Sequence, residues 1–416
     1  MIPRLLLKRS CPRTIGNSSL RCEFSSLAPD DSFFDVTIVG GGVVGSSIAN
    51  LLNKKLPSLR VALIESKDKP PSQPLPENER VPSPRSYALS PRSLEILGEA
   101  VQSRLPIGYY DSMQVWQAQS PATLTFTSRD LDPDPTKGKY LGGCCEDQSL
   151  VSTLWEDIQG STEILLNTKL NSIDVGDSSN LVTVKTEDGS KFETALLVGA
   201  DGGQSWVRKE AGISRIGSDY ELSALTFTVS LEKSIDRRAF QRYLSDGGPL
   251  ALLPTYSPDH AVVVWSTSPE EVSRWKNASD EDLVRHLNRC LLEGPERIPP
   301  LMEQSPQHSK QGDLFSNLIY GAERVLDTVH YGLAMAAQHP EPSFRVPPEI
   351  STIASPKFSF PLSCCNATTY VKGRVALVGD AAHTVHPMAG KFGIFTSNRV
   401  QSFMVFKSQN QSSFVK

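Results

Sequence analysis

The alternation of apolar and polar residues predicts a strand, a turn, a helix and a second strand near the start of the chain. Residues 33–39 read FFDVTIV, a β-branched and aromatic run typical of a buried strand. In the stretch SSIANLLNKKL that follows a glycine-rich turn, apolar residues recur at helical spacing: Ile48, Leu51, Leu52 and Leu56. The run RVALI at residues 60–64 then predicts a second strand that ends at Glu65.

Two later strand-like runs each lead into a turn that contains glycine and aspartate. Residues 195–198 lead into Gly199-Ala200-Asp201-Gly202, and residues 374–378 lead into Gly379-Asp380-Ala381-Ala382-His383. We expect a helix to start after each turn, and an aspartate there can cap its first N–H groups. Capping alone would explain either motif taken singly.

The middle of the chain predicts antiparallel strands and then helices. LTFTVSL at residues 225–231 alternates apolar and polar positions, which predicts a half-buried strand, whereas AVVVW at 261–265 predicts a buried one. DEDLVRHLNRC at 280–290 has the spacing of an amphipathic helix opened by acidic residues. A less regular helical stretch is expected at 316–337, before a proline-rich loop at 340–348.

The first thirty residues have the composition of a targeting segment. They carry Arg4, Lys8, Arg9, Arg13 and Arg21, contain several serines, and have no acidic residue before Glu23. Basic, serine-containing and acid-poor sequence is typical of a mitochondrial transit peptide. The alternative is a disordered tail whose charge arose by chance.

Composition narrows the classes of protein further. The 416 residues are 39% hydrophobic and 21% charged, with a mean hydropathy of -0.25, which is globular composition. The net charge of -4 predicts no broad basic surface, so nucleic acid is excluded as a main partner. No apolar run reaches the roughly 18 residues of a membrane-spanning helix, which leaves peripheral membrane contact open.

Cysteine and histidine usage predicts neither a disulfide framework nor a metal site. The 7 cysteines form no C-x-x-C pattern, and the adjacent pair Cys144-Cys145 cannot join distant segments. His383 and His386 could share one helical face, but two ligands do not make a metal site. We therefore expect a reducing compartment and no bound metal.

The glycines after the first strand suit a dinucleotide. Gly40, Gly42 and Gly45 form G-x-G-x-x-G directly after a strand and at the start of a helix. Gly40 would permit the tight turn, Gly42 would let a pyrophosphate approach the backbone, and Gly45 would let helix and strand pack closely. The helix N-terminus favours phosphate, and Glu65 is placed to accept hydrogen bonds from ribose hydroxyls. This motif alone does not choose between FAD and NAD.

The three motifs together resemble the fingerprints of the class A flavoprotein monooxygenases, the aromatic-hydroxylase family, over about residues 34 to 390. Arg85-Ser86-Tyr87-Ala88-Leu89-Ser90 also resembles the Arg-x-x-Ala-Leu-Ser segment of that family. The stretch from Gly379 to Gly390 is most similar to the ubiquinone-biosynthesis hydroxylases within it. The resemblance implies FAD as the cofactor and an α/β fold: a Rossmann-like FAD-binding domain with an inserted antiparallel-sheet (α+β) substrate domain.

The resemblance also implies roles for single residues. Glu65 would bind the adenosine ribose, and Arg85 would lie near the flavin and pyrophosphate. The Asp201-Gly202 motif would serve FAD and, in many members, a reduced nicotinamide. Gly379-Asp380 would meet the ribityl chain, and Pro387 would lie over the flavin at the catalytic position.

By the same resemblance, the chain hydroxylates C5 of a polyprenylated hydroxybenzoate-type intermediate in ubiquinone biosynthesis, through a flavin C4a-hydroperoxide. Its partners would be this phenolic substrate, O2, other ubiquinone-biosynthesis proteins, and an electron donor. The donor is either a ferredoxin with its reductase or NAD(P)H. The expected location is the mitochondrion, peripherally on the matrix side of the inner membrane. Another FAD oxidoreductase of the superfamily, an epoxidase or a reductase, is the alternative enzyme.

The expected organisation has five parts: a transit peptide (1–30), the first part of the FAD-binding domain (33–215), the substrate domain (216–365), the return of the FAD-binding domain (366–390) and a divergent tail (391–416). After Gly390 the family continues Gln-Gly-x-Asn and a long helix, whereas this chain reads Lys391-Phe392-Gly393-Ile394. The departure predicts a truncated terminus and a weak enzyme. A non-catalytic form that acts at most as an assembly partner is therefore a second hypothesis.

Overall fold

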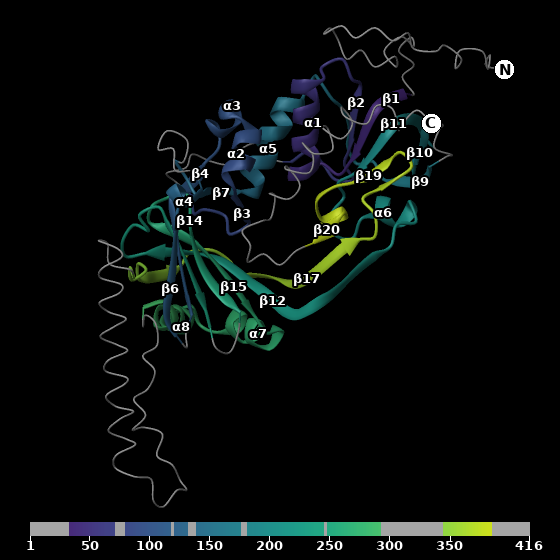
Figure 1. Cartoon of the computed structure of the whole chain (residues 1–416). Coiled ribbons are helices and arrows are strands. Elements are labelled where there is room, and N and C mark those ends of the chain that lie inside the picture. The colour runs from purple at the N-terminus through teal and green to yellow at the C-terminus, as the bar shows by residue number, and fades with distance from the viewer. Residues whose placement is uncertain are drawn as a thin grey trace, which may run out of the picture.

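The computed structural model describes residues 33–70, 80–117, 120–131, 139–175, 181–244, 248–292 and 344–384. The strands of the described residues form two large sheets and one small sheet (Figure 1). The presequence, the helical stretch at 316–337, Pro387 and the divergent tail lie outside the described residues. Expectations about those segments remain predictions.

The first sheet contains the predicted dinucleotide-binding elements. Its parallel strands lie in the order β19 (Val375–Leu377), β11 (Lys191–Gly199), β1 (Phe33–Val39), β2 (Val61–Ile64) and β8 (Glu163–Leu165). Antiparallel strands β18 (Val371–Lys372), β10 (Val182–Thr186) and β9 (Leu170–Asp174) complete it. Helices α1 (Val43–Lys55) and α5 (Asp147–Ile158) share one hydrophobic cluster with this sheet, and α6 (Trp206–Glu210) joins another.

The third sheet is small and antiparallel, and its side chains Tyr110 and Cys144 pack with Ala239 of the second large sheet. It contains β3 (Ser86–Leu89), β7 (Gly142–Glu146) and β4 (Ile107–Tyr110), beside helices α2 (Pro91–Leu97) and α3 (Glu99–Gln102). A side chain at Gly108 of β4 would overlap the backbone of Thr255, at the end of a strand of the second large sheet. The absence of a side chain at Gly108 therefore allows the two parts of the molecule to pack closely.

The second large sheet is antiparallel except for one pair of strands. Its order is β20 (His383–Thr384), β17 (Phe358–Ala367), β12 (Arg215–Leu231), β15 (His260–Thr267), β14 (Pro249–Pro254), β13 (Arg238–Tyr243), β5 (Ser112–Gln117) and β6 (Ser120–Thr127), with β16 (Ile350–Ile353) beside β12. The pair β13–β5 is parallel. Because β5 and β6 belong to this sheet, the predicted first part, 33–215, contributes two strands to it.

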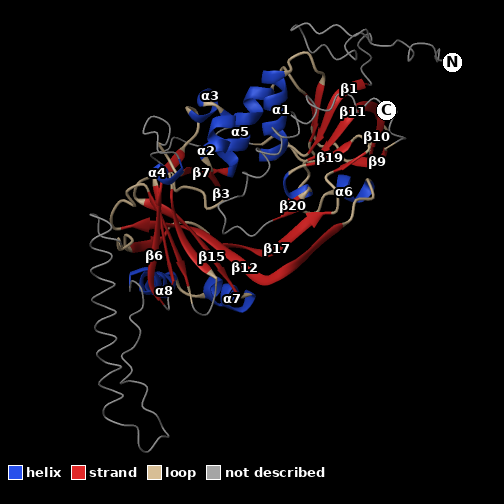
Figure 2. Cartoon of the chain, viewed as in Figure 1, coloured by secondary structure: helices blue, strands red, loops and turns tan. Residues whose placement is uncertain are grey.

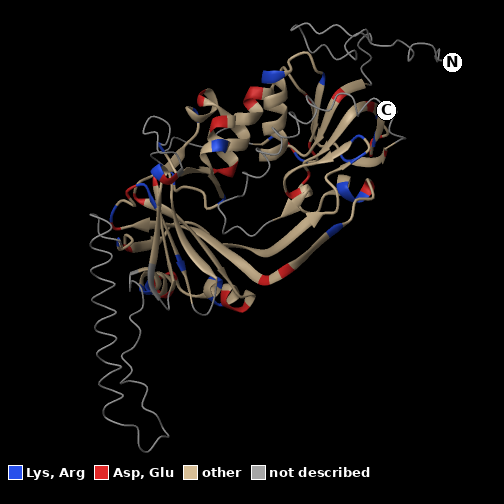
Figure 3. Cartoon of the chain, in the orientation of Figure 1, with Lys and Arg blue, Asp and Glu red and all other residues tan. Residues whose placement is uncertain are grey.

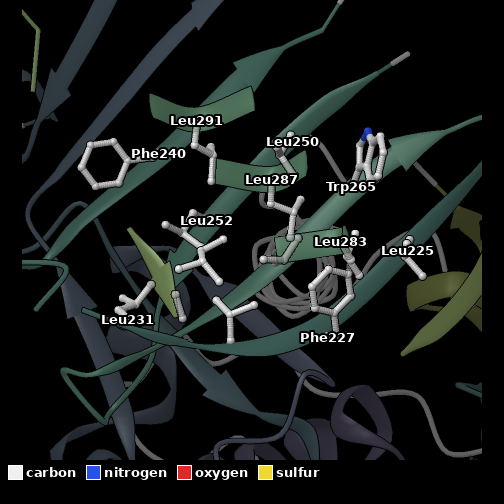
Figure 4. Close-up of a cluster of buried hydrophobic side chains, with 14 of the residues drawn as sticks. Leu225, Phe227, Leu231, Phe240, Leu250, Leu252, Trp265, Leu283, Leu287 and Leu291 are labelled. Carbon is white, nitrogen blue, oxygen red and sulfur yellow. The ribbon is translucent and has the colours of Figure 1, made fainter. Parts of the chain in front are cut away.

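One face of the second sheet is covered by α7 (Pro269–Asn277) and α8 (Asp280–Leu292). The predicted amphipathic helix is confirmed, because its apolar positions Leu283, Leu287 and Leu291 are fully buried. They pack against Phe227, Leu252 and other side chains of the sheet, as Figure 4 shows. Burying each of these leucine side chains stabilises the folded state by about 1.5–3 kcal/mol relative to leaving it exposed.

Residues 225–231 form a strand as predicted, but the prediction that this strand is half-buried is wrong. The strand is longer, and every residue from Leu225 to Val229 is buried, on both faces. The polar positions Thr226 and Thr228 lie against residues 80–84. Thr228 Oγ1 donates to Pro82 O (2.7 Å), whereas Thr226 Oγ1 lies 3.4 Å from Pro84 O and donates to Val263 O of β15 (2.9 Å). The covering segment is distant in sequence, so alternation in the strand could not predict it.

Strands β12 and β17 pair along almost their whole lengths and connect the two large sheets as a long ribbon (Figure 2). The ladder runs from the pair Arg215↔Ala367 to the pair Thr226↔Phe358, with a bulge between Asp219 and Ser223. The predicted α/β class, with an antiparallel sheet beside a Rossmann-like sheet, is confirmed.

Candidate functional site

The three glycine-containing turns come together at one edge of the first sheet. They follow β1, β11 and β19, which are neighbours in the order β19-β11-β1 and run parallel. Backbone hydrogen bonds join them in series: Ala200 N donates to Val39 O (2.8 Å), and Val378 N donates to Gly199 O (3.0 Å). In Figure 1 the turn before β20 and strand β3 lie on the side of the first sheet that faces the second sheet.

Each glycine of the first turn has a different environment. Gly40 has φ +105°, and an added Cβ would lie 2.5 Å from Ala200 O; at Gly45, one would overlap the carbonyl oxygen of Gly40. The tight turn and the close packing predicted for these two glycines are confirmed. At Gly42, by contrast, an added Cβ would have no neighbour within 4 Å.

The start of α1 suits an anion. Its N-cap residue is Gly42, no side chain caps it, and its first turn contains no acidic residue. The first N–H groups of a helix have no intrahelical acceptor and carry partial positive charge. Open space at Gly42 beside uncapped N–H groups is a cradle that fits a phosphate.

Glu65 lies at the end of β2, next to this turn, as the sequence predicts. Its carboxylate already accepts hydrogen bonds within the protein: Oε2 from Gly41 N (2.8 Å), and Oε1 from Lys67 N (3.0 Å) and Ser66 Oγ (3.3 Å). An ionised carboxylate has about four acceptor positions, so capacity for a ribose hydroxyl remains.

Asp201 accepts a hydrogen bond from the start of the next helix, as the capping explanation predicts, although the N-cap residue of that helix is Ser205. Its Oδ2 accepts from Val207 N (2.9 Å) in the first turn of α6. Its Oδ1 is buried and has no hydrogen-bond partner among the described residues. A buried unpaired carboxylate oxygen is costly, so this atom suits an added donor. Gly202, with φ +81°, has open space where a Cβ would lie.

The turn after β19 packs against the other two. Gly379 has φ +58°, and an added Cβ would lie 3.0 Å from a methyl group of Val44 in α1. Buried Arg208 donates through Nη1 to Ala381 O (2.9 Å) and through Nη2 to Gly203 O (3.0 Å), which joins this turn to the second one. The local sequence around Arg208 does not predict that this side chain joins the two turns.

The helix start expected after this turn is not observed in the described residues. A single 3-10 turn, η3 (Gly379–Ala381), is followed by β20, which pairs with β17. Asp380 has an exposed side chain, yet removal of water by the surrounding protein raises its pKa above the ordinary value. Because that carboxylate faces solvent, we regard this effect as small.

A polar cluster lies beside these turns. Arg85 Nε contacts Asp147 Oδ2 (2.9 Å), and Tyr87 Oη donates to Asp147 Oδ1 (2.7 Å). Burial, and then the negative charges of Asp147 and more weakly Asp380, raise the pKa of Tyr87, so its hydroxyl stays protonated and can donate. The side chain of Arg85 is 79% exposed, so it is available to a bound anion.

Sequence reasoning missed Asp147, Tyr87 and a further residue, Trp155. Asp147 is the first residue of α5, where an acidic residue is ordinarily explained by the helix dipole. Tyr87 lies in the segment Arg85–Ser90, but a tyrosine at that position does not by itself indicate a function. Trp155 is buried in α5 and donates from Nε1 to Gly41 O (2.7 Å), a contact across 114 positions of sequence.

The described residues do not suggest a metal or a membrane-spanning helix. Among them, no group of three or more His, Cys, Asp or Glu side chains could hold a metal ion. In the same part of the chain, no helix is long and apolar enough to cross a bilayer. Acidic and basic residues are interspersed along the described part of the chain, as Figure 3 shows.

Comparison with known sequences identifies relatives over most of the chain. The model of the FAD binding domain family matches residues 34–304. The chain is 31% identical over 386 residues to the mitochondrial ubiquinone biosynthesis monooxygenase COQ6 of Xenopus tropicalis, covering 88% of this chain and 75% of that protein. It is 29% identical over 381 residues to the COQ6 monooxygenase of Homo sapiens, covering 88% and 74%.

Solved structures share the fold. PqsL of Pseudomonas aeruginosa, in complex with 2-aminobenzoylacetate, has a TM-score of 0.62 at 21% identity, covering 92% of this chain and 89% of that chain. The p-nitrophenol 4-monooxygenase PnpA of Pseudomonas putida has a TM-score of 0.59 at 17% identity, covering 92% and 83%. At these identities, the likeness concerns the fold alone.

Proposed function

The chain belongs to the FAD-binding domain family and is an FAD-dependent monooxygenase, and from that premise we propose that it hydroxylates C5 of a polyprenylated hydroxybenzoate-type intermediate in ubiquinone biosynthesis. The observation that carries the proposal is the meeting of three glycine-containing turns at the ends of β1, β11 and β19. The names of the relatives support the pathway, since they are ubiquinone biosynthesis monooxygenases.

The proposed FAD site assigns one part of the cofactor to each turn. Gly40, Gly42 and Gly45 receive the pyrophosphate at the start of α1, and Glu65 accepts from the adenosine ribose. Asp380, with Gly379, meets the ribityl chain. The uncapped start of α1 and the open space at Gly42 support the first assignment.

The remaining assignments concern the flavin end. Exposed Arg85 reaches the pyrophosphate or flavin, held in place by Asp147. Asp201 and Gly202 serve FAD and, where it is the donor, a nicotinamide. Pro387, outside the described residues, lies over the flavin.

When bound and reduced, FAD supplies the activation of dioxygen: one oxygen atom enters the electron-rich ring, and the other leaves as water. The protein binds and orients the ring and excludes water. For this we assign the face of the second sheet opposite α7 and α8. Phe358 lies on that face with an exposed ring, beside its ladder partner Thr226, which is itself buried under residues 80–84.

The proposed location is the matrix side of the mitochondrial inner membrane, with peripheral attachment. The relatives are named as mitochondrial, and residues 1–30 have transit-peptide composition. We propose other ubiquinone-biosynthesis proteins as partners there.

The test uses the whole chain, loaded with FAD, and a short-tailed prenylated hydroxybenzoate with deuterium at C5. Electrons come from a ferredoxin with its reductase in one arm and from NADPH or NADH in the other. We expect a product that has lost the deuterium and gained one oxygen atom from labelled O2 in at least one arm. Reduced flavin that only releases peroxide in both arms would contradict the proposal, and an epoxide product would favour the alternative enzyme.

A further inference from the structure

Gly41 occupies the x position of the G-x-G turn. Two side chains that are distant in sequence form hydrogen bonds with its carbonyl oxygen and its N–H. Its carbonyl oxygen accepts from Trp155 Nε1 (2.7 Å), and its N–H donates to Glu65 Oε2 (2.8 Å). Trp155 belongs to α5, and Glu65 follows β2. The turn between β1 and α1 is therefore fixed by hydrogen bonds to two other elements.

Steric contacts at Gly41 point to the same pair of side chains. Gly41 is not among the glycines with positive φ, so its backbone does not demand glycine. An added Cβ would instead lie 2.5 Å from Trp155 Cζ2 and 3.1 Å from Glu65 Oε2. The indole ring is 1% exposed and packs in the cluster that includes Val36 and Ile48, so it has little freedom to move.

We propose that Trp155 is a positioning residue for FAD: its indole N–H holds Gly41 so that the start of α1 is ready for the pyrophosphate before the cofactor arrives. A preorganised site saves the ordering cost that binding would otherwise carry. Because Gly41 also donates to Glu65, the same turn joins the proposed phosphate and ribose contacts. The proposal rests on FAD binding and not on which ring is hydroxylated.

The competing explanation is that Trp155 is only a core residue. The chain offers a matched control, because Trp116 is also buried (2%) but its Nε1 has no hydrogen-bond acceptor among the described residues. Trp116 lies in β5, in the core beneath α8, and none of the proposed cofactor contacts involves it. Replacing either tryptophan by phenylalanine removes a similar amount of packing. Only the replacement of Trp155 also removes a hydrogen bond to the turn.

The experiment measures the Kd of FAD for the deflavinated whole chain by calorimetry, together with the Tm of the apo protein. We expect Trp155→Phe to raise the Kd about three- to tenfold, the value of one hydrogen bond, and Trp116→Phe to change it less than twofold. Both variants should lower the apo Tm. A Kd that rises equally in both variants, or in neither, would overturn the proposal.

Two further variants keep the proposal testable if Trp155→Phe does not fold. Incorporation of 3-benzothienylalanine at position 155 keeps the ring volume and removes only the N–H, so the same rise in Kd is expected. In a double-mutant cycle, Gly41→Ala should weaken FAD binding far less when combined with Trp155→Leu, because the clashing ring is gone. Unchanged Kd in the first variant, or additive effects in the cycle, would contradict the positioning role.

Discussion

At the scale of single residues, Gly42 and Gly45 differ in what surrounds them, although the same motif contains both. A methyl group at Gly45 would overlap the carbonyl oxygen of Gly40, whereas one at Gly42 would meet open space. Gly45 is therefore required by the folded chain itself. At position 42, glycine is required only for binding of the pyrophosphate that we propose for this turn.

The two glycines should respond differently to alanine. Gly45→Ala should lower the free energy of unfolding of the apo protein by about 1–3 kcal/mol, because the helix must move away from the turn. Gly42→Ala should leave apo stability within about 0.5 kcal/mol but weaken FAD binding at least tenfold. Urea unfolding and FAD titration of both variants test this contrast, and unchanged flavin affinity in Gly42→Ala would count against the phosphate assignment.

Asp380 makes stability depend on pH in a defined direction. Its pKa in the folded protein is raised above 3.8 by loss of water, so the folded state favours the protonated form. The stability that it contributes is complete below pH 3.8 and is lost as the pH rises through its folded pKa. At neutral pH, the ionised carboxylate therefore costs the apo protein only a small amount of stability, because it faces solvent.

Asp380→Asn should consequently raise the apo Tm slightly at pH 7 but not at pH 3.5. The same variant should weaken FAD binding at pH 7 about three- to tenfold, because it loses a charged acceptor. Thermal unfolding at several pH values and FAD titration provide the two measurements. A variant that is less stable than the parent at pH 7 and binds FAD equally well would refute both parts.

At the scale of elements, residues 80–84 connect the small sheet to the second large sheet. Arg80 forms an ion pair with Glu146 of β7, with side chains 16% and 3% exposed, and its guanidinium lies over the ring of Tyr256, 5.4 Å from the ring centroid. Glu146 also accepts from Ser83 N (2.5 Å). The segment that precedes Arg85 is thereby held from both sides.

Breaking this buried pair should be costly. Glu146→Gln should reduce the free energy of unfolding by about 3 kcal/mol, because it leaves the Arg80 charge uncompensated. The control is Glu95→Gln, which breaks the exposed pair with Arg92 (42% and 67% exposed) and should cost less than about 0.5 kcal/mol. Equal losses in urea unfolding would show that the segment does not depend on the buried charge.

The elements also show what sequence patterns can and cannot predict. Strand β1, helices α1 and α8, and the glycine turns follow from local periodicity and steric rules, and they are confirmed. The burial of Thr226 and the contact of Trp155 with Gly41 depend on segments more than a hundred positions away. Local periodicity carries no information about such contacts, so only the fold reveals them.

At the scale of the whole molecule, cofactor binding should stabilise the chain through mass action. FAD at about 100 times its Kd should add about 2.7 kcal/mol to the free energy of unfolding. FMN, which lacks the adenosine half, should add much less at the same concentration, since the turn at Gly42 and the carboxylate of Glu65 would have no partner. Thermal unfolding with each flavin tests this, and equal stabilisation by FMN would contradict the assignment of the first turn.

The ribbon of β12 and β17 limits how this enzyme could be recombined with its relatives. A graft of the second sheet has to cross over at two residues of one ladder pair, such as Arg215 and Ala367, because any offset would join mismatched registers. A second exchanged piece is needed as well, since β5 and β6 come from upstream and β5 pairs with β13. The second sheet, to which we assign substrate binding, would therefore have to be exchanged as two coordinated segments, and a chimaera that received only one of them would contain mispaired strands.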